Sequence, residues 1–218
     1  MQPIRVQFKK EGRAKYISHL DLNRVMQRAL RRAKIPVWIT QGFNPHPYIV
    51  FAMPLSLFYE SDCEIMDARL DGDMPLDEVK ESLAAQMPQG IVITEVSSPK
   101  LKLTEVSFAT YHISFEFDGK SKEELDRMLK ELLLRDDIII EKSTKHRILS
   151  IDIKQYFDEA DIKVIDGFIE MVSTLPAGSK ENLNPVCFSA AFEKYGYKPE
   201  FENVRRIKIL TEDKKEFE

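Results

Sequence analysis

The chain has 218 residues, of which 43% are apolar and 31% charged, and its formal net charge is −4. This composition excludes an intrinsically disordered chain, because it supplies enough apolar residues for a buried core. No stretch approaches the roughly 18 apolar residues of a membrane-spanning helix, and the first ten residues lack the apolar segment of a signal peptide.

The first part of the chain predicts the element order β-α-β-β-α-β. Residues 4–9 alternate between apolar and polar side chains, as in a half-buried strand. A helix is predicted over 18–34, where apolar residues recur at helical spacing, Ser18 and Asp21 resemble a capping box, and Pro36 stops the helix. The remaining elements are extended segments at 37–40 and 49–55, a strand at 64–70, a helix at 76–86 and a strand at 90–96.

After a polar linker at 97–103, the same order begins again. Residues 110–117 alternate as a strand, and Ser121 with Glu124 predicts the capping box of a helix that extends to Leu133. The later elements are strands at 138–141, 148–153 and 163–173, a helix at 186–195 and a strand at 204–210. The final eight residues, TEDKKEFE, are expected to be loosely held.

These patterns predict an α+β fold. We expect two tandem ferredoxin-like units, at residues 1–97 and 104–212, each with the order β-α-β-β-α-β. Each unit would be an antiparallel sheet with its helices on one face, and the second would contain an additional hairpin. The repetition concerns the fold, since the two halves share no repeated sequence.

Positive charge is concentrated at the N-terminal end. The first 50 residues contain ten Lys and Arg against two acidic residues, a net +8, whereas the other 168 contain 22 against 34, a net −12. Such asymmetry favours an anionic partner for the basic end. On the predicted helix, four arginines lie opposite the apolar stripe and follow Lys15 in the chain: Arg24, Arg28, Arg31 and Arg32.

This arginine stripe allows two interpretations. A charged stripe is commonly a solvated helix face, but such faces usually mix acidic and basic residues for i,i+4 pairing. The stripe here has a single sign, and planar guanidinium groups bind phosphate in a bidentate manner. Because ferredoxin-like sheets also offer a surface for RNA, the sequence favours RNA, with no DNA or membrane partner expected.

Ser18 and His19 occupy the predicted start of this helix. Free N–H groups and the positive end of the helix dipole make such a position receptive to an anion. His19 would then contact a phosphate or act as a general acid or base. The alternative is that Ser18 caps the helix and His19 is simply exposed.

The loop Gly42-Phe43-Asn44-Pro45-His46-Pro47 follows the helix. Pro45 and Pro47 stiffen it and Gly42 permits a positive φ, as a preorganised binding loop would require. Asn44 and His46 would supply its polar groups. The alternative is a structural turn between two extended segments.

Metal and cofactor binding are not expected. His19 and His46 are the only histidines of the first half, and with Asp21 they match no metal-ligand spacing. Cys63 and Cys187 are too few for a disulfide framework or a thiolate site, which fits a reduced, cytoplasmic protein.

Three segments in order carry a family resemblance: Lys15-Tyr16-Ile17-Ser18-His19-Leu20-Asp21-Leu22, Arg28-Ala29-Leu30-Arg31-Arg32-Ala33, and the loop 42–47. Over residues 4–70 the chain resembles the radical-SAM-linked domain of unknown function. That family tends to have a Lys after the His-Pro of the loop, where this chain has Tyr48. Its members are fused to or encoded beside radical SAM proteins, with a genomic association to RNA-processing and ribosomal genes.

The resemblance implies an accessory module with a radical SAM protein as partner. The chain lacks the cluster-binding cysteines, so it is not itself the radical SAM catalyst. We hypothesise a non-catalytic protein that presents tRNA or rRNA to that partner. Lys15 and the four arginines would contact phosphates, Ser18 and His19 would hold an anion, and Asn44 and His46 would orient a base or the RNA backbone.

Two other hypotheses stay open. The first is a metal-independent RNA-processing enzyme that uses His19 and His46 as an acid–base pair, by analogy with the architecture of repeat-associated CRISPR endoribonucleases. The second is a pure protein-interaction module, in which the basic face meets an acidic surface of the radical SAM partner.

Overall fold

The computed structural model describes residues 1–143, 148–179 and 181–217. The chain divides into two compact units: unit 1 comprises Met1–Val106 and Arg206–Glu218, and unit 2 comprises Ser107–Arg205. The C-terminal segment, which the sequence assigned to the second unit or to a loose tail, therefore belongs to unit 1. Within the described ranges, none of the helices has the length and apolar character needed to cross a membrane.

Unit 1 is a mixed α+β structure. Its elements are β1 (Gln2–Lys10), a 3-10 turn (Gly12–Tyr16), α1 (His19–Arg32), β2 (Ile49–Phe51), β3 (Glu60–Leu70), α2 (Leu76–Ala84), β4 (Ile91–Ser97) and a 3-10 turn (Leu103–Glu105). The strands follow the order β4-β1-β3-β10, in which β10 is Phe201–Leu210, and β2 also pairs with β3. The pairs β1–β3, β1–β4 and β2–β3 are antiparallel. The extended segment predicted at 37–40 forms only isolated bridges, through Val37 and Ile39.

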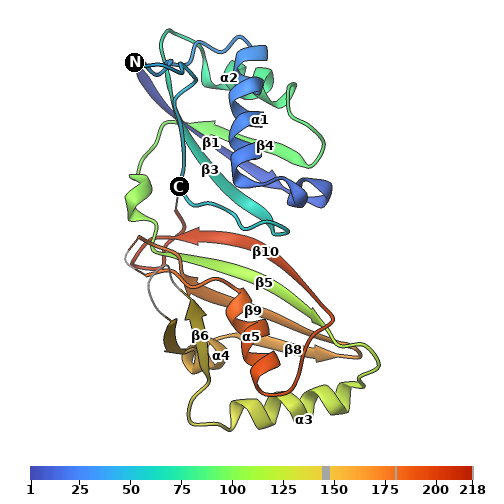
Figure 1. Cartoon of the computed structure of the whole chain (residues 1–218). Coiled ribbons are helices and arrows are strands. Elements are labelled where there is room, and N and C mark those ends of the chain that lie inside the picture. Colours follow the sequence, from blue (N-terminus) through green and yellow to red (C-terminus); the bar gives the residue numbers. More distant parts are fainter. Residues whose placement is uncertain (144–147, 180, 218) are drawn as a thin grey trace. The chain divides into compact units, whose positions relative to one another are not determined.

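The core of unit 1 lies between its strands and its two helices (Figure 1). Ile4, Val6 and Phe8 of β1 alternate onto one face, as the sequence predicted, and all three are completely buried. Both helices pack against the same buried cluster, through Leu22, Met26, Ala29 and Leu30 of α1 and Val79 and Leu83 of α2. This packing leaves the opposite side of α1 facing solvent.

Arg5 corrects the expectation that β1 is only half-buried. Its guanidinium is fully buried, donating from Nε to Oδ1 of Asp67 at 2.8 Å and from Nη2 to Oδ2 at 2.9 Å. It also donates to the carbonyl oxygen of Leu101 at 2.8 Å and lies 4.7 Å from the ring centroid of Phe217. The linker and the C-terminal tail therefore cover this part of β1, and the prediction of a loose tail is wrong up to Phe217.

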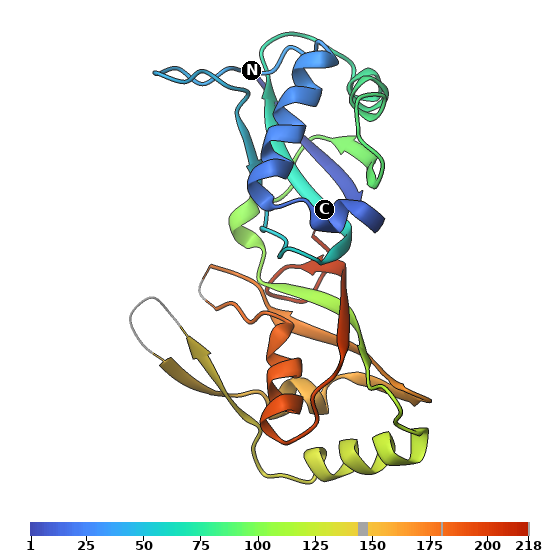
Figure 2. The same ribbon diagram turned by 45° about the vertical axis from the view of Figure 1, so that its right-hand side comes forward.

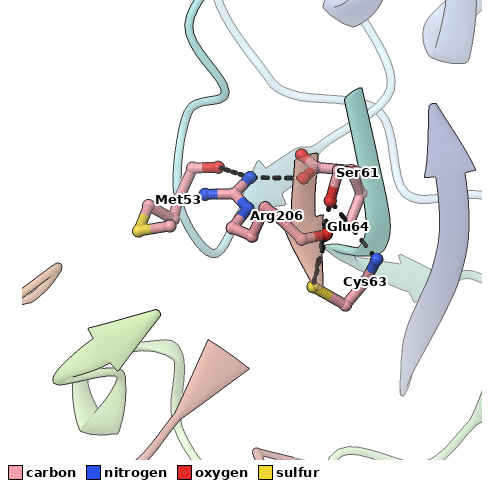
Figure 3. Close-up of polar contacts among 5 residues, drawn as sticks. All are labelled: Met53, Ser61, Cys63, Glu64 and Arg206. Carbon is pink, nitrogen blue, oxygen red and sulfur yellow. Dashed lines mark hydrogen bonds and ion pairs between the residues drawn. The ribbon is translucent and has the colours of Figure 1, made fainter. Parts of the chain in front are cut away.

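A second buried ionic group lies where Arg206 of β10 meets β3 (Figure 3). The Arg206 guanidinium forms an ion pair with Glu64 and donates to the carbonyl oxygen of Met53 at 3.3 Å. Lys10 is also buried, and desolvation lowers its pKa, with the positive charge of Arg206 acting in the same direction and Glu64 opposing both. The Cys63 thiol contacts the Arg206 carbonyl oxygen at 3.7 Å, and burial raises its pKa to about 12.

Unit 2 is also a mixed α+β structure. Its elements are β5 (Phe108–Glu116), α3 (Lys122–Leu133), β6 (Ile139–Ser143), β7 (Ile148–Asp152), α4 (Lys154–Asp158), β8 (Asp161–Ile165), β9 (Phe168–Pro176), α5 (Val186–Lys194) and the start of β10 (Phe201–Leu210). The strands follow the order β10-β5-β9-β8, and β6 and β7 form a separate antiparallel hairpin. The strand predicted at 163–173 is instead a hairpin, because Asp166 and Gly167 form a two-residue turn between Ile165 and Phe168.

Gly90 occupies a position in unit 1 that only glycine fits. Its φ is +88°, its carbonyl oxygen accepts the N–H of Glu11 at 2.8 Å, and a Cβ there would lie 2.4 Å from the Glu11 carbonyl oxygen. We expect Gly90→Ala to lower the free energy of unfolding by about 2 kcal/mol or more, since the positive φ alone costs a non-glycine residue roughly 1–2 kcal/mol. Urea unfolding followed by circular dichroism measures the loss.

Gly119→Ala is the matched control for that substitution. Gly119 also has a positive φ, of +68°, but a Cβ there meets nothing within 4 Å. It should therefore show only the conformational cost. Equal losses in the two variants would contradict the backbone clash at Gly90.

Candidate nucleic-acid interface

Ser18 caps α1, and in doing so it is already engaged. Its Oγ accepts the N–H of Asp21 at 3.1 Å and donates to Oδ2 of the same residue at 2.8 Å. The hydrogen bond from Ser18, followed by that from Arg24, lowers the pKa of the Asp21 carboxyl. The anion at the start of this helix is thus the chain's own Asp21, where a carboxylate stabilises the positive end of the dipole. Ser18 is therefore the N-cap of α1, and its hydroxyl group is already bonded to Asp21.

His19 packs against an aromatic ring. Its centroid lies 5.1 Å from that of Phe51 in an edge-to-face arrangement, and Phe51 in turn lies 6.3 Å from Phe8 of the core. The His19 side chain is half-buried. These contacts fix the ring to β2 and explain its position by packing.

The four arginines that the sequence singled out all lie on the exposed side of α1, and we call them the arginine face: Arg24, Arg28, Arg31 and Arg32. Arg24 forms an ion pair with Asp21 at 2.8 Å. Arg31 donates to the Pro45 carbonyl oxygen at 3.2 Å and Arg32 to that of Gln86 at 2.8 Å. Arg28 has no hydrogen bond or ion pair with any described residue.

Most of the positive charge of the arginine face is therefore not compensated by acidic side chains. Only Arg24 has an acidic partner among the residues that the structure describes, since Arg31 and Arg32 bond to neutral carbonyl oxygens. A guanidinium has five N–H donors, so one bond to a carbonyl leaves others for a phosphate. Three uncompensated guanidinium groups on one helix face form a surface suited to a polyanion.

The Gly42–Pro47 loop lies at the tip of a narrow hairpin that projects from unit 1 (Figure 2). Ile39 pairs with Pro47, and the Thr40 N–H donates to the His46 carbonyl oxygen at 2.9 Å. Gly42 has a φ of +143°, which favours glycine. The chain here is thus a hairpin closed by its own hydrogen bonds.

His46 is oriented by this hairpin. Its backbone N–H donates to Thr40 Oγ1 at 3.1 Å, and its ring Nδ1 lies 2.7 Å from the carbonyl oxygen of Asn44. A carbonyl oxygen only accepts, so the proton is on Nδ1 and the neutral ring keeps Nε2 as an acceptor. The Asn44 side chain is exposed at the tip. The bond from Arg31 to Pro45 joins the hairpin to the arginine face.

His19 and His46 belong to opposite ends of α1. Arg31, which contacts the hairpin, lies 12 residues after His19, so the helical rise separates them by about 18 Å. Phe51, which His19 contacts, is five positions after His46, an extended span of up to about 16 Å. An acid–base pair requires both groups within hydrogen-bond reach of one substrate. The structure does not bring these two histidines together in that way.

The other basic residues of the N-terminal segment are not all at the surface. Arg5 and Lys10 are buried, and Lys9 lies 3.7 Å from Asp62. Lys15 belongs to the 3-10 turn before α1, with its Nζ 5.7 Å from the ring centroid of Tyr16. The net charge of the first 50 residues therefore overstates the charge offered to a partner.

No group of three or more His, Cys, Asp or Glu is arranged to hold a metal ion in the described parts of the chain. Burial raises the pKa of Cys63 and of Cys187 to about 12, so neither is a thiolate nucleophile at neutral pH. His112, in unit 2, lies 2.9 Å from Glu170.

Sequence reasoning missed one exposed feature beside α1, the aromatic pair Tyr16 and Phe58. No signal in the sequence distinguishes these two rings from core aromatics. They are 42 positions apart, and apolar residues of both kinds look alike in a sequence.

Comparison with known proteins gives one family and one fold. A family model described as "uncharacterized protein conserved in bacteria" (DUF2344) matches residues 3–185. No curated protein matches the chain. A solved structure, "Crystal Structure of a Cbf5-Nop10-Gar1 Complex", is similar with a TM-score of 0.50 and 8% identity, over 94% of this chain and 48% of that chain. This chain thus spans about half the length of that structure, and the likeness concerns the fold alone.

Proposed function

We propose that this chain, which belongs to the DUF2344 family of uncharacterised bacterial proteins, is a cytoplasmic, non-catalytic RNA-binding accessory protein. The observation that carries the proposal is the arginine face, in which Arg28, Arg31 and Arg32 have no acidic partner among the described residues. Charge that a fold leaves uncompensated on one face favours a polyanionic partner. The ligand would be tRNA or rRNA.

The order of the strands supports a finer description of the fold. We propose that each unit is ferredoxin-like. Unit 1 has the order β4-β1-β3 with β2 on the far side of β3, and unit 2 has β10-β5-β9-β8. In chain order, β1, β2, β3 and β4 are the first to fourth strands of unit 1, and β5, β8, β9 and β10 are those of unit 2. Both units then have the spatial strand order 4-1-3-2 of a β-α-β-β-α-β unit. The β6–β7 hairpin and α4 would be an insertion in unit 2.

The contacts suggest which part of the RNA each residue of this surface would bind. Arg28, Arg31 and Arg32 would contact phosphates, with Lys15 extending the basic surface toward the start of α1. Asn44 and the free Nε2 of His46, held by the rigid hairpin, would orient a base or a ribose. Ser18 and His19 would take no part, since the cap and the Phe51 contact account for them.

The partner is proposed from the sequence motifs. The segments 15–22, 28–33 and 42–47 resemble the radical-SAM-linked domain, and α1 and the hairpin bring the last two together through Arg31 and Pro45. An accessory protein that presents RNA to a radical SAM enzyme accounts for a basic surface without catalytic groups. A catalytic role for His19 and His46 has no geometric support.

The test is a titration of total cellular RNA against the intact protein at a series of salt concentrations. We expect the logarithm of the affinity to fall linearly with the logarithm of the salt concentration. The slope should be about −2, since each of three phosphate contacts with single-stranded RNA contributes about −0.7. Binding that is independent of salt would contradict the arginine face as the RNA surface. Absence of binding would favour the protein-interaction module, for which the fully exposed Phe43 at the hairpin tip is an available contact.

A further inference from the structure

Tyr16 and Phe58 form an exposed aromatic pair beside the start of α1. Their ring centroids lie 5.9 Å apart with an interplanar angle of 75°, an edge-to-face contact. The two residues are 62% and 58% exposed. The Phe58 N–H donates to the carbonyl oxygen of Lys15 at 2.9 Å, so the backbone holds the two rings together.

Phe58 has a backbone conformation that aromatic residues rarely adopt. Its φ is +72°, in the left-handed region, where a Cβ clashes with the neighbouring carbonyl oxygen. Glycine would adopt the same conformation without strain. An exposed ring recovers little of that cost through burial, and residues held in such conformations are concentrated at binding sites. The ring at position 58 thus calls for a reason other than stability.

Positive charge flanks the pair. The Lys15 ammonium lies 5.7 Å from the centroid of the Tyr16 ring. Arg13, in the same 3-10 turn, is exposed and makes no hydrogen bond or ion pair with the described part of the chain. Aromatic faces beside cations are the combination that binds unpaired nucleic-acid bases, with the rings stacking on bases and the cations contacting phosphates. An apolar protein surface would leave these two cations without partners.

We propose that Tyr16 and Phe58 are a stacking platform for unpaired bases. The inference rests on the proposed RNA binding and specifies its substrate class as RNA that is single-stranded at this position. The arginine face would contact phosphates of either single-stranded or paired RNA, whereas the platform requires bases that are free to leave the helical stack.

The test compares fluorescently labelled polyuridine with a labelled RNA duplex, by anisotropy titration of the intact protein. Tyr16→Ala should weaken polyuridine binding roughly tenfold, the effect of removing one stacked base. It should leave duplex binding unchanged. Tyr16→Phe keeps the ring and should bind polyuridine like the wild type.

Phe58 provides a readout that a structural role would not give. Phe58→Gly relieves the positive φ, so it should raise the melting temperature while weakening polyuridine binding, two effects of opposite sign. Phe58→Leu keeps apolar bulk without a ring and should also bind polyuridine weakly. Full polyuridine binding by Phe58→Leu would overturn stacking on this ring, because leucine has no aromatic face.

The outcomes separate this inference from the proposed function. Wild-type binding to both RNAs, with Tyr16→Ala and Phe58→Gly unchanged, would overturn the platform and leave RNA binding by the arginine face intact. Failure of the wild-type protein to bind either RNA would overturn both proposals.

Discussion

Glu64→Ala should lower the free energy of unfolding by about 3–5 kcal/mol, the cost of removing one partner from a buried ion pair. Glu64 and Arg206 are both almost completely buried and form an ion pair (Figure 3). The charges of both groups act on the pKa of Lys10. Glu64 is the group that raises the pKa of Lys10 against desolvation and the charge of Arg206. Its removal would leave two buried cations, Lys10 and Arg206, that repel each other without a compensating anion, so we expect a larger loss than from Arg206→Ala.

The matched control replaces both charges at once. Glu64→Leu combined with Arg206→Met keeps the volume apolar and leaves no uncompensated arginine, so it should recover most of the stability lost in Glu64→Ala. Urea unfolding of Glu64→Ala, Arg206→Ala and the double variant measures the order of their stabilities. A double variant as unstable as Glu64→Ala would show that the hydrogen bond from Arg206 to the Met53 carbonyl oxygen, rather than charge pairing, maintains this part of unit 1.

We also predict how the stability of Glu64→Ala depends on pH. Without Glu64, the pKa of Lys10 in the folded state falls further below the ordinary value of about 10.4. Between these two values the unfolded chain binds more protons than the folded chain, so the stability of Glu64→Ala should rise with pH and level off near 10.4. Adding Lys10→Met should remove this dependence.

Local patterns in the sequence identified α1 correctly. Apolar residues at helical spacing placed Leu22, Met26 and Leu30 in the core, and Ser18 was recognised as its cap. These features depend on neighbours within a few positions, which a sequence displays directly. The arginine face followed from the same periodicity, because the side opposite a buried stripe is exposed.

Contacts distant in the sequence could not be predicted in the same way. Arg5 occupies a polar position of an alternating strand, and its burial is explained by the linker at Leu101 and by the return of residues 206–217 to unit 1. The tail reads as polar and loose, yet Phe217 is buried and its N–H donates to Ile209 at 2.9 Å. A sequence gives no measure of which strand another segment will cover, so the basic charge of the N-terminal segment was counted as if all of it were exposed.

The error in the strand predicted at 163–173 could have been avoided from the sequence. The dipeptide Asp166-Gly167 is a strong hairpin signature, and it divides the long strand predicted at 163–173 into β8 and β9. In the candidate site, the sequence identified residues but could not predict the distances between them. The residues of α1 and of the hairpin were identified individually, but the distance between His19 and His46 depends on the packing of α1 against β2, which no local pattern encodes.

The combined change Arg28→Glu and Arg31→Glu should weaken RNA binding by at least about 100-fold, because it removes two phosphate contacts and adds two repulsive charges. The salt slope should become shallower by about 1.4, or about 0.7 for each contact with single-stranded RNA. Both side chains are exposed on α1, so the melting temperature should change little. The measurement is the titration of cellular RNA across salt concentrations described above.

Arg127→Glu with Lys130→Glu is the matched control for this pair. Both residues are exposed on α3 of unit 2, at the same spacing of three, and the change in net charge is identical. If RNA recognises the arginine face, the control variant should bind nearly as the wild type does. Equal losses in the two variants would mean that RNA responds to the overall charge of the protein, and α1 would then have no special role. A loss confined to Arg28 and Arg31 would identify α1 as the surface on which RNA lies.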